Sequence, residues 1–441
     1  MTAPFLQSDT IASWGRVVRA SHRVARPRFA DELAALITAD EDGPALPIGL
    51  RRSYGDSNLN PDGRVIDMTG LDRLIAFDRE TGIMQAEAGL SLSQALQILV
   101  PAGWFLPTTP GTRFVTLGGA VANDVHGKNH HSAGSFGASV TRLRLLRTDG
   151  SAHELAPGDP LFHATIGGLG LTGPIEWVEF RATRIPSAQL DAQDTEFTHV
   201  RDYFDIAAEA HALCEHTMAW IDCTSGGARL GRGVLSAANW SPHGDLQPHR
   251  EEPKRAIPVD APGFALSRLT VGAFNSVFHE LKRMRTGPFR THYEPFLYPL
   301  DKIANWNRLY GRDGFYQYQC VLPPPTARAG VEELLKVIAA SGQASFLAVL
   351  KDFGAHAPVG LLSFPMEGTT LALDFRNLGD RTLSLMADLD RIVLSAGGRL
   401  YPAKDGRISP AMFAAGFPKL QDFRVYVDPG LSSAFWRRAA G

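Results

Sequence analysis

Apolar and polar positions along the chain fall into short runs that switch repeatedly between helical and strand spacing. Residues 28–40 place apolar side chains at helical intervals and predict a first helix. A second helix is expected over 92–100, with Ser91 as its N-cap and Pro101 and Gly103 at its end. The same spacing predicts further helices at 159–164, 200–218, 327–341 and 381–395.

Strand-like runs lie between these helices. They are expected from 45 into a turn at Gly55, and at 65–68, 75–88 (a hairpin about Thr81 and Gly82), 140–147, 175–181, 314–322, 345–351, 361–365 and 370–375. The last two are expected to pair. Strands and covering helices after 314 are typical of an antiparallel sheet with helices on one face, and the whole order indicates an α+β fold.

Composition sets the class of protein. A chain of 441 residues predicts two domains, and glycine density drops near 187, where we place a boundary. A net charge of −2 gives no basic footprint for nucleic acid. The three cysteines form no CxxC pair, so neither a disulfide framework nor a zinc site is indicated, and a reducing compartment fits.

No targeting or spanning segment is expected. The N-terminus lacks a basic start followed by an apolar core, and no apolar run is long enough to cross a membrane. Peripheral membrane contact stays open. Residues 226–258 are polar, contain proline and show little pattern, so we expect a mobile loop over the surface or the site.

The strongest candidate for a binding segment is 110–137, PGTRFVTLGGAVANDVHGKNHHSAGSFG. Its glycines allow tight turns and close approach of backbone to a ligand. Two other interpretations exist. His126 and His130, with His131 following, have a spacing that could hold a metal on one helical face, although neighbouring glycines disfavour a helix and no cysteine or HExxH partner is near. The segment could also be a surface loop with incidental histidines.

With its HGKNHHSAGSFG core, this segment closely resembles the flavin-binding segment of the decaprenylphosphoryl-β-D-ribose 2'-oxidases, in the vanillyl-alcohol oxidase superfamily with its PCMH-type FAD-binding domain. The resemblance covers nearly the whole chain and is strongest at 48–57, 110–137, 162–175 and 400–407. It implies a two-domain fold, with an FAD-binding domain of 1–186 plus 400–441. Residues 187–399 would form a substrate-binding cap domain on an antiparallel sheet.

The resemblance implies FAD, with its pyrophosphate in the turn that ends at Ser57, where successive N–H groups can bind an anion. Many sugar-oxidising relatives carry a flavin-bonding histidine in this turn, whereas this chain has Arg52, so we expect non-covalent FAD. Residues 168–173 match GxGxxG, but a helix before and a strand after exclude a Rossmann turn, and in the family this segment lies along the flavin. The implied FAD-binding residues are Arg51, Arg52, Ser53, Tyr54, Gly55, Asp56, Ser57, Pro110, Gly111, Thr112, Thr116, Gly118, Gly119, Ala122, Asn123, His126, Gly127, Asn129, His130, Ser132, Gly134, Ser135, Gly170, Thr172, Gly173, Ile175, Tyr401 and Ala403.

Residues 401–405 match the family's YxAKD segment, whose lysine approaches the flavin ring. We expect Lys404 to be the base, because burial beside the flavin would lower its pKa; a surface lysine in a turn is the alternative. His126 is the second implied catalytic residue. The implied substrate-binding residues are Lys128, Tyr318, Lys351, Asp374 and Lys404, and lysines suit a phosphate. The aromatic face of strand 314–322 could instead be core, and no metal is expected.

The implied activity is oxidation of a secondary hydroxyl, at C2, of a polyprenyl-phosphoryl pentose by hydride transfer to flavin N5, as half of an epimerisation. A quinone or other electron acceptor and a short-chain reductase partner are implied, in the cytoplasm or at the inner face of the membrane. The alternatives are an oxygen-using oxidase of a soluble sugar, sugar alcohol or aldonolactone, and a non-catalytic FAD-binding partner subunit. Ala372 replaces a pocket cysteine that reacts with nitroaromatic inhibitors in mycobacterial members, which predicts weak covalent inhibition and could signal a changed substrate.

Overall fold

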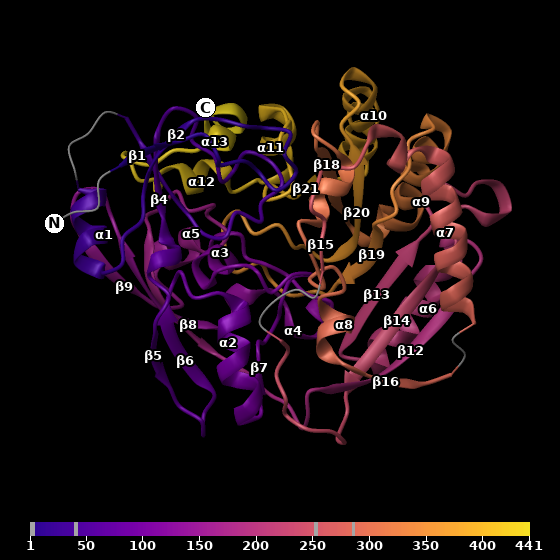
Figure 1. Ribbon diagram of the computed structural model, residues 1–441, viewed down its shortest axis with the longest axis horizontal. Coiled ribbons are helices and arrows are strands. Elements are labelled where there is room, and N and C mark those ends of the chain that lie inside the picture. The colour runs from indigo at the N-terminus through magenta and orange to yellow at the C-terminus, as the bar shows by residue number, and fades with distance from the viewer. Residues whose placement is uncertain (1–4, 39–42, 251–254, 285–286) are drawn as a thin grey trace.

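The computed structural model describes residues 5–38, 43–250, 255–284 and 287–441. The N-terminal part of the chain and its C-terminal end lie on one side, and a large sheet from the middle of the chain lies on the other (Figure 1). Helices and antiparallel sheets together make an α+β fold, as predicted.

Two sheets build the N-terminal side. The first has the order β1-β2-β4-β3, from Leu6–Ser8, His22–Ala25, Arg64–Asp67 and Ala45–Ile48. Helix α1 (Ala30–Ile37) buries Leu33, Leu36 and Ile37 in this layer. The second sheet is antiparallel with the order β5-β6-β10-β8-β9, from Leu74–Phe77, Ile83–Glu87, Ile175–Arg181, Val140–Leu146 and Ala152–Leu155.

Helix α2 (Leu92–Leu99) begins as the sequence predicted. The Ser91 hydroxyl accepts from the Gln94 N–H and the Gln94 side chain accepts from the Ser91 N–H, a capping box. Its end is also as predicted, because Gly103 adopts a left-handed φ of 80° after a short turn containing Pro101. A two-stranded ladder of β7 (Trp104–Phe105) and β11 (Thr183–Arg184) follows.

The glycine-rich segment is partly helical. It contains α3 (Leu117–Ala122) and one turn of helix, α4 (His130–Ala133), which lies between Gly127 and Gly134. Helix α5 (Pro160–Thr165) precedes the GxGxxG run and β10 follows it, so this run is not a Rossmann turn.

The large sheet has eight strands, and every neighbouring pair is antiparallel. Its order is β16 (Phe289–His292), β12 (Gln189–Phe197), β14 (Gly233–Trp240), β13 (His216–Ile221), β19 (Ala348–Phe353), β20 (Gly368–Arg376), β18 (Phe315–Leu322) and β21 (Arg399–Leu400). A small parallel pair joins β15 (Arg255–Ala256) to β17 (Ile303–Ala304).

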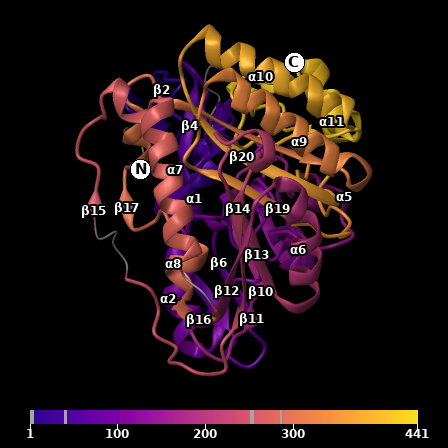
Figure 2. The same ribbon diagram turned by 90° about the vertical axis from the view of Figure 1, so that its right-hand side faces the viewer.

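Helices cover one face of the large sheet. They are α6 (Val200–Leu213), α9 (Pro324–Ser341) and α10 (Asp380–Ser395), which share one core with the strands. Helix α7 (Arg268–Arg283) packs on the other face, where Phe278 contacts Trp220 of β13, and it stands apart from the three covering helices (Figure 2). The predicted placement of helices on one face therefore holds for three of these four.

The C-terminal helices return to the N-terminal side. They are α11 (Pro410–Gly416), α12 (Leu420–Arg424) and α13 (Ala434–Ala439). The short helix α8 (Tyr293–Leu297), from the middle of the chain, lies nearer the middle of the molecule (Figure 1). Arg438 of α13 pairs with Asp56 at 2.8 Å. The domain limits at 186/187 and 399/400 stay a prediction.

Three predicted elements were wrong. The helix expected over 200–218 ends at Leu213, and Met218 lies in β13, whose residues are held between two strands. The loop expected over 226–258 contains β14, whose small glycine, serine and alanine residues pack closely in the sheet but resemble a loop in sequence. Residues 251–254 of the expected loop lie outside the described chain. Residues 361–365 form no strand, and Ser363 there donates to Asp124 instead.

Among the residues that the structure describes, no helix is long and apolar enough to cross a membrane.

Candidate active site

A cavity of about 580 Å³ lies between the N-terminal side and the large sheet. On the N-terminal side its wall comes from the turn after β3, the segment 109–128, the glycine run at 169–175 and residues 401–404. The sheet contributes Met218, Gln317, Gln319, Leu347, Val349, Lys351, Thr370 and Ala372, and the segment 299–306 closes one side. The backbone bond from Thr217 N–H to Lys128 O, 2.9 Å, ties the two walls together.

Most of the predicted FAD-binding residues line this cavity. They are Arg51, Arg52, Ser53, Tyr54, Ser57, Pro110, Gly111, Thr112, Thr116, Gly118, Gly119, Ala122, Asn123, His126, Gly127, Gly170, Gly173, Ile175, Tyr401 and Ala403. The sequence missed Phe114, which lies within the glycine-rich segment. It also missed Trp14, Met218, Gln317, Gln319 and the segment 299–306, which come from parts of the chain with no recognisable motif.

The other predicted FAD-binding residues lie behind the residues that line the cavity. They are Gly55, Asp56, Asn129, His130, Ser132, Gly134, Ser135 and Thr172. They stabilise the lining segments: Asp56 pairs with Arg438, and Asn129 bonds Thr108 and the carbonyl of Pro107 at 2.9 and 2.8 Å. A Cβ at Gly55 would lie 1.5 Å from the Asp405 carbonyl oxygen, so this glycine permits close packing.

The N-terminal wall fits a cofactor such as FAD. Within the described chain, the Ser57 hydroxyl and both amide atoms of Asn58 are buried without a hydrogen-bond partner, although both residues line the cavity. Arg51 and Leu169 adopt left-handed φ angles of 58° and 57°, a strain of about 1 kcal/mol or more each that clusters at functional sites. Polar atoms without protein partners need a ligand or water that can bond them.

Lys404 lies in the turn after β21, with its Nζ 3.9 Å from the centre of the Tyr54 ring. Burial lowers the pKa of Lys404 to about 8, and the nearby Asp374 opposes this shift. Burial raises the pKa of Asp374 to about 7. Asp374 does not line the cavity. It lies behind Gln317, whose amide donates to it at 2.6 Å.

His126 and Lys351 form a second polar pair in the cavity. Lys351 Nζ lies 2.9 Å from His126 Nδ1 and donates to the Gly127 carbonyl at 3.2 Å. The Gln319 amide lies 3.2 Å from His126 Nε2, so both ring nitrogens are engaged. Burial and then the charge of Lys351 hold the pKa of His126 well below its usual range, and burial and then Lys128 do the same to Lys351.

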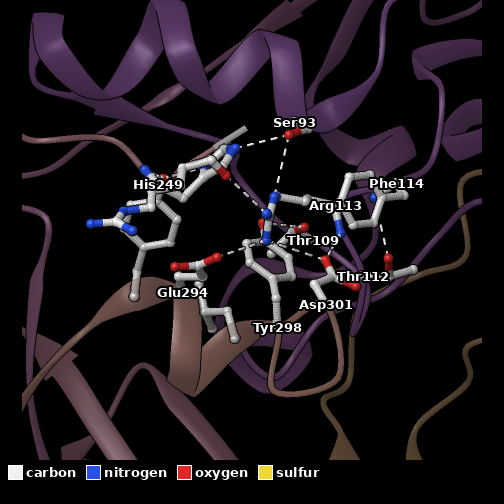
Figure 3. Close-up of polar contacts among 12 residues, drawn as sticks. Ser93, Thr109, Thr112, Arg113, Phe114, His249, Glu294, Tyr298 and Asp301 are labelled. Carbon is white, nitrogen blue, oxygen red and sulfur yellow. Dashed lines mark hydrogen bonds and ion pairs between the residues drawn. The ribbon is translucent and has the colours of Figure 1, made fainter. Parts of the chain in front are cut away.

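Lys128 lies beside a buried ion cluster that the sequence missed. Its Nζ donates to the Leu297 carbonyl at 2.9 Å, and burial lowers its pKa to about 8. The neighbouring Arg113 is fully buried, 3.2 Å from Glu294 and 3.6 Å from Asp301, and its N–H donates to Asp301 at 2.8 Å (Figure 3). Asp301 lines the cavity. Arg113 therefore joins the glycine-rich segment to the segment that closes the cavity.

The structure does not place Tyr318 in the cavity wall. Side chains alternate along β18, and it is Gln317 and Gln319 that line the cavity. Tyr318 points into the core under the covering helices, where its hydroxyl donates to Asp390 at 3.1 Å. The alternative interpretation, core packing, applies to this tyrosine.

The histidines of the glycine-rich segment have separate partners. His131 Nε2 lies 2.9 Å from the Cys214 carbonyl, and the His130 ring packs on Phe353. In the described part of the chain, no group of three His, Cys, Asp or Glu side chains is placed to hold a metal.

We expect the free energy of unfolding to fall as the pH drops from about 6.5 toward 3. Burial lowers the pKa of His130 and His216 to about 3, from 6.5. Below pH 6.5 the unfolded chain binds protons that the folded chain refuses, so stability falls until the folded pKa is reached. In urea unfolding, the free energy of unfolding of His216→Gln should fall less between neutral and mildly acidic pH than that of the wild type. His243→Gln, at an exposed site, is the control, and equal slopes for all three would contradict the expectation.

The Ala372→Cys variant should gain one cavity thiol. Ala372 lines the cavity, whereas Cys223 and Cys320 are buried with pKa values raised to about 12 by desolvation. A small maleimide should therefore add one more label to the variant than to the wild type, read by intact mass. Labelling at the same extent in both proteins would show that position 372 is closed to solutes.

Comparisons with known proteins agree with this geometry. A family model described as an FAD binding domain matches residues 21–156. Decaprenylphosphoryl-β-D-ribose oxidase of Mycolicibacterium smegmatis is 36% identical, over 95% of this chain and 94% of its own length. An alditol oxidase from Streptomyces is 23% identical over 38% of this chain and 40% of its own. An L-gulono-1,4-lactone dehydrogenase from Mycobacterium tuberculosis is 28% identical over 44% of this chain and 48% of its own length.

The match to the mycobacterial oxidase spans both walls of the cavity, and the FAD-domain match covers the turn after β3 and the glycine-rich segment. The unpartnered polar atoms of Ser57 and Asn58 and the strained turn fit the binding of a polar ligand such as FAD. The chain is therefore an FAD-dependent oxidoreductase that belongs to the decaprenylphosphoryl-β-D-ribose oxidase family of the PCMH-type FAD-binding superfamily.

Proposed function

We propose that the protein oxidises the C2 hydroxyl of a polyprenyl-phosphoryl pentose to the keto sugar, as one half of an epimerisation. The observation that carries this proposal is the set of three lysines that line one cavity, Lys128, Lys351 and Lys404, each with a pKa lowered by desolvation. The charges of Lys128 and Lys404 each lower the pKa of Lys351. Such a cluster is unfavourable on its own, and a phosphate that accepts hydrogen bonds from it would offset the repulsion.

The protein residues would supply the proton chemistry and the orientation. FAD, when bound, supplies the hydride acceptor. With a pKa of about 8, Lys404 is partly neutral near physiological pH and can take the proton of the sugar hydroxyl. His126 is held between Lys351 and Gln319, which fixes the orientation of its ring at the cavity wall. Lys128 and Lys351 would bind the phosphate or the sugar oxygens.

The apolar part of the cavity wall suits an apolar chain. It includes Trp14, Leu300, Ile303, Trp306 and Leu347. Trp14 and Trp306 contact each other edge to face at 5.7 Å, and both pack in one aromatic cluster with Leu347. An isoprenoid tail attached to the phosphate could pack against these side chains, whereas a soluble polyol would leave them exposed to water.

We further propose that FAD is held non-covalently. Among the described residues, the cavity is lined by one histidine, His126, whose ring nitrogens are both engaged, and by no cysteine. The turn position that bonds flavin in many relatives carries Arg52. A quinone or other acceptor would reoxidise the flavin, and a separate reductase would complete the epimerisation. The three free cysteines support a location in the cytoplasm or at the inner membrane face.

Isotopic labelling tests which hydroxyl reacts. Polyprenyl-phosphoryl ribose carrying deuterium at C2 should show a primary isotope effect on anaerobic flavin reduction, because that C–H bond breaks in the step observed. The C3-deuterated compound is the matched control and should react at the unlabelled rate. An isotope effect with the C3-deuterated compound only would show that C3 is the carbon oxidised and would contradict the proposal.

A further inference from the structure

Helix α7 buries polar side chains and exposes apolar ones, the opposite of an ordinary surface helix. Its buried positions include two polar side chains, Asn275 and His279. Its solvent side carries what we call the outer stripe, five apolar side chains that are between 48% and 85% exposed: Leu269, Phe274, Val277, Leu281 and Met284. Apolar surface concentrated on one exposed helix face marks an interaction site.

Specific polar contacts fix this orientation. The Asn275 amide donates to Asp222 at 3.0 Å and to the Ser345 carbonyl at 3.3 Å. Lys282 pairs with Asp194 at 3.0 Å. Turning the outer stripe inward would break these bonds and leave Asp222 without Asn275 and Asp194 without Lys282. The stripe therefore needs a partner outside the fold.

A series of apolar contacts joins the outer stripe to the cavity wall. Phe274 of α7 contacts Phe346 at 5.8 Å, and Phe346 stacks on Tyr310 at 5.6 Å. Phe346 and the cavity-lining Leu347 pack in the same cluster as Trp306. Apolar side chains therefore connect the cavity to α7, which lies at the right-hand edge of Figure 1 and toward the viewer in Figure 2.

Charge selects the partner. Residues 255–312, which include α7 and the segment that closes the cavity, carry nine lysines and arginines against four acids, although the whole chain has a net charge of −2. Arg268 and Arg283 at the two ends of α7 are exposed. An anionic surface would complement this charge, whereas a second copy of the chain would bring the same positive segment against it.

We propose that the outer stripe of α7 docks the protein on an anionic lipid bilayer, with the apolar part of the cavity wall turned toward the acyl chains. This inference rests on the proposed function, because a lipid-linked substrate must present its phosphoryl sugar to the site while its tail stays in an apolar phase. Docking at α7 lets the tail pass from the bilayer along Phe346 and Leu347 into the cavity.

Co-sedimentation of the FAD-loaded protein with vesicles tests the proposal, using phosphatidylcholine with and without phosphatidylglycerol and no polyprenyl sugar. The wild type should bind the anionic vesicles, and added salt should weaken binding. The variant Leu269→Gln/Val277→Gln/Leu281→Gln should lose at least about tenfold in affinity, because three apolar side chains no longer insert. The control Leu213→Gln/Val425→Gln changes two side chains that are each 77% exposed elsewhere and should bind like the wild type.

Two outcomes would overturn docking on lipid: wild-type binding by the α7 variant, or a wild-type dimer in solution that the α7 variant dissociates. Turnover of a short-chain polyprenyl-phosphoryl ribose in detergent is measured in parallel. Turnover without vesicle binding would contradict the docking proposal and leave the proposed function standing. Vesicle binding without turnover would contradict the proposed function and leave docking on lipid standing.

Discussion

Lys404→Met is expected to slow anaerobic flavin reduction by about 10²- to 10⁴-fold, the usual contribution of a positioned base. The change removes the amine and keeps much of the side chain's bulk beside Tyr54, so FAD should stay bound. Lys419→Met, at an exposed position, is the matched control and should react at the wild-type rate. A Lys404→Met enzyme that keeps its FAD and reduces it within a few-fold of the wild-type rate would exclude Lys404 as the base.

The pH dependence gives the same test a second readout. Because burial lowers the pKa of Lys404 to about 8, the neutral amine, which is the form that accepts a proton, predominates above that pH. The rate of flavin reduction in the wild type should therefore rise with pH through about 8 and then level off. Lys404→Met should lack this rise, which a purely structural role for the lysine would not predict.

Arg113→Met is expected to lower the free energy of unfolding by about 3 to 5 kcal/mol, because it leaves buried acids without their cation. Arg113 is fully buried between Glu294 and Asp301, and its N–H and guanidinium also bond Asp301 and Ser93 (Figure 3). Urea unfolding followed by far-UV circular dichroism measures the change. Lost contact between the segment 299–306 and the glycine-rich segment should also weaken FAD retention.

The control for Arg113 is an exposed ion pair of the same kind. Arg290 pairs with Asp191 at 2.8 Å with both side chains nearly half exposed, and Arg290→Met should cost less than about 1 kcal/mol. Similar losses for the two variants would show that burial of the Arg113 cluster contributes nothing beyond a surface pair.

Local signals in the sequence were sufficient for several features. Ser91 followed by Gln94 predicts the cap of α2, and the structure confirms it as a capping box. For the GxGxxG run at 168–173, the predicted order of a helix before it and a strand after it excluded a Rossmann turn. The structure shows the same order. The FAD cofactor and the family followed from the glycine-rich segment, and both are confirmed by the comparisons.

Features that depend on packing between distant segments escaped prediction. Alternation along β18 was visible in the sequence, but which face meets the cavity depends on where the covering helices pack, so Gln317 and Gln319 were missed in favour of Tyr318. Strand β14 has small side chains that resemble a loop until neighbouring strands enclose them. Arg113 and Asp301 are 188 positions apart in the sequence, and no local sequence pattern predicts such a pair.

The central claim is that this cavity oxidises a lipid-linked sugar phosphate. Its most direct test is anaerobic titration of the FAD-loaded protein with polyprenyl-phosphoryl ribose and, separately, with simple polyols, following flavin absorbance. We predict bleaching by the lipid-linked sugar alone, and its loss in Lys404→Met. Bleaching by polyols alone would contradict the claim and assign the protein to the oxidases of soluble sugars.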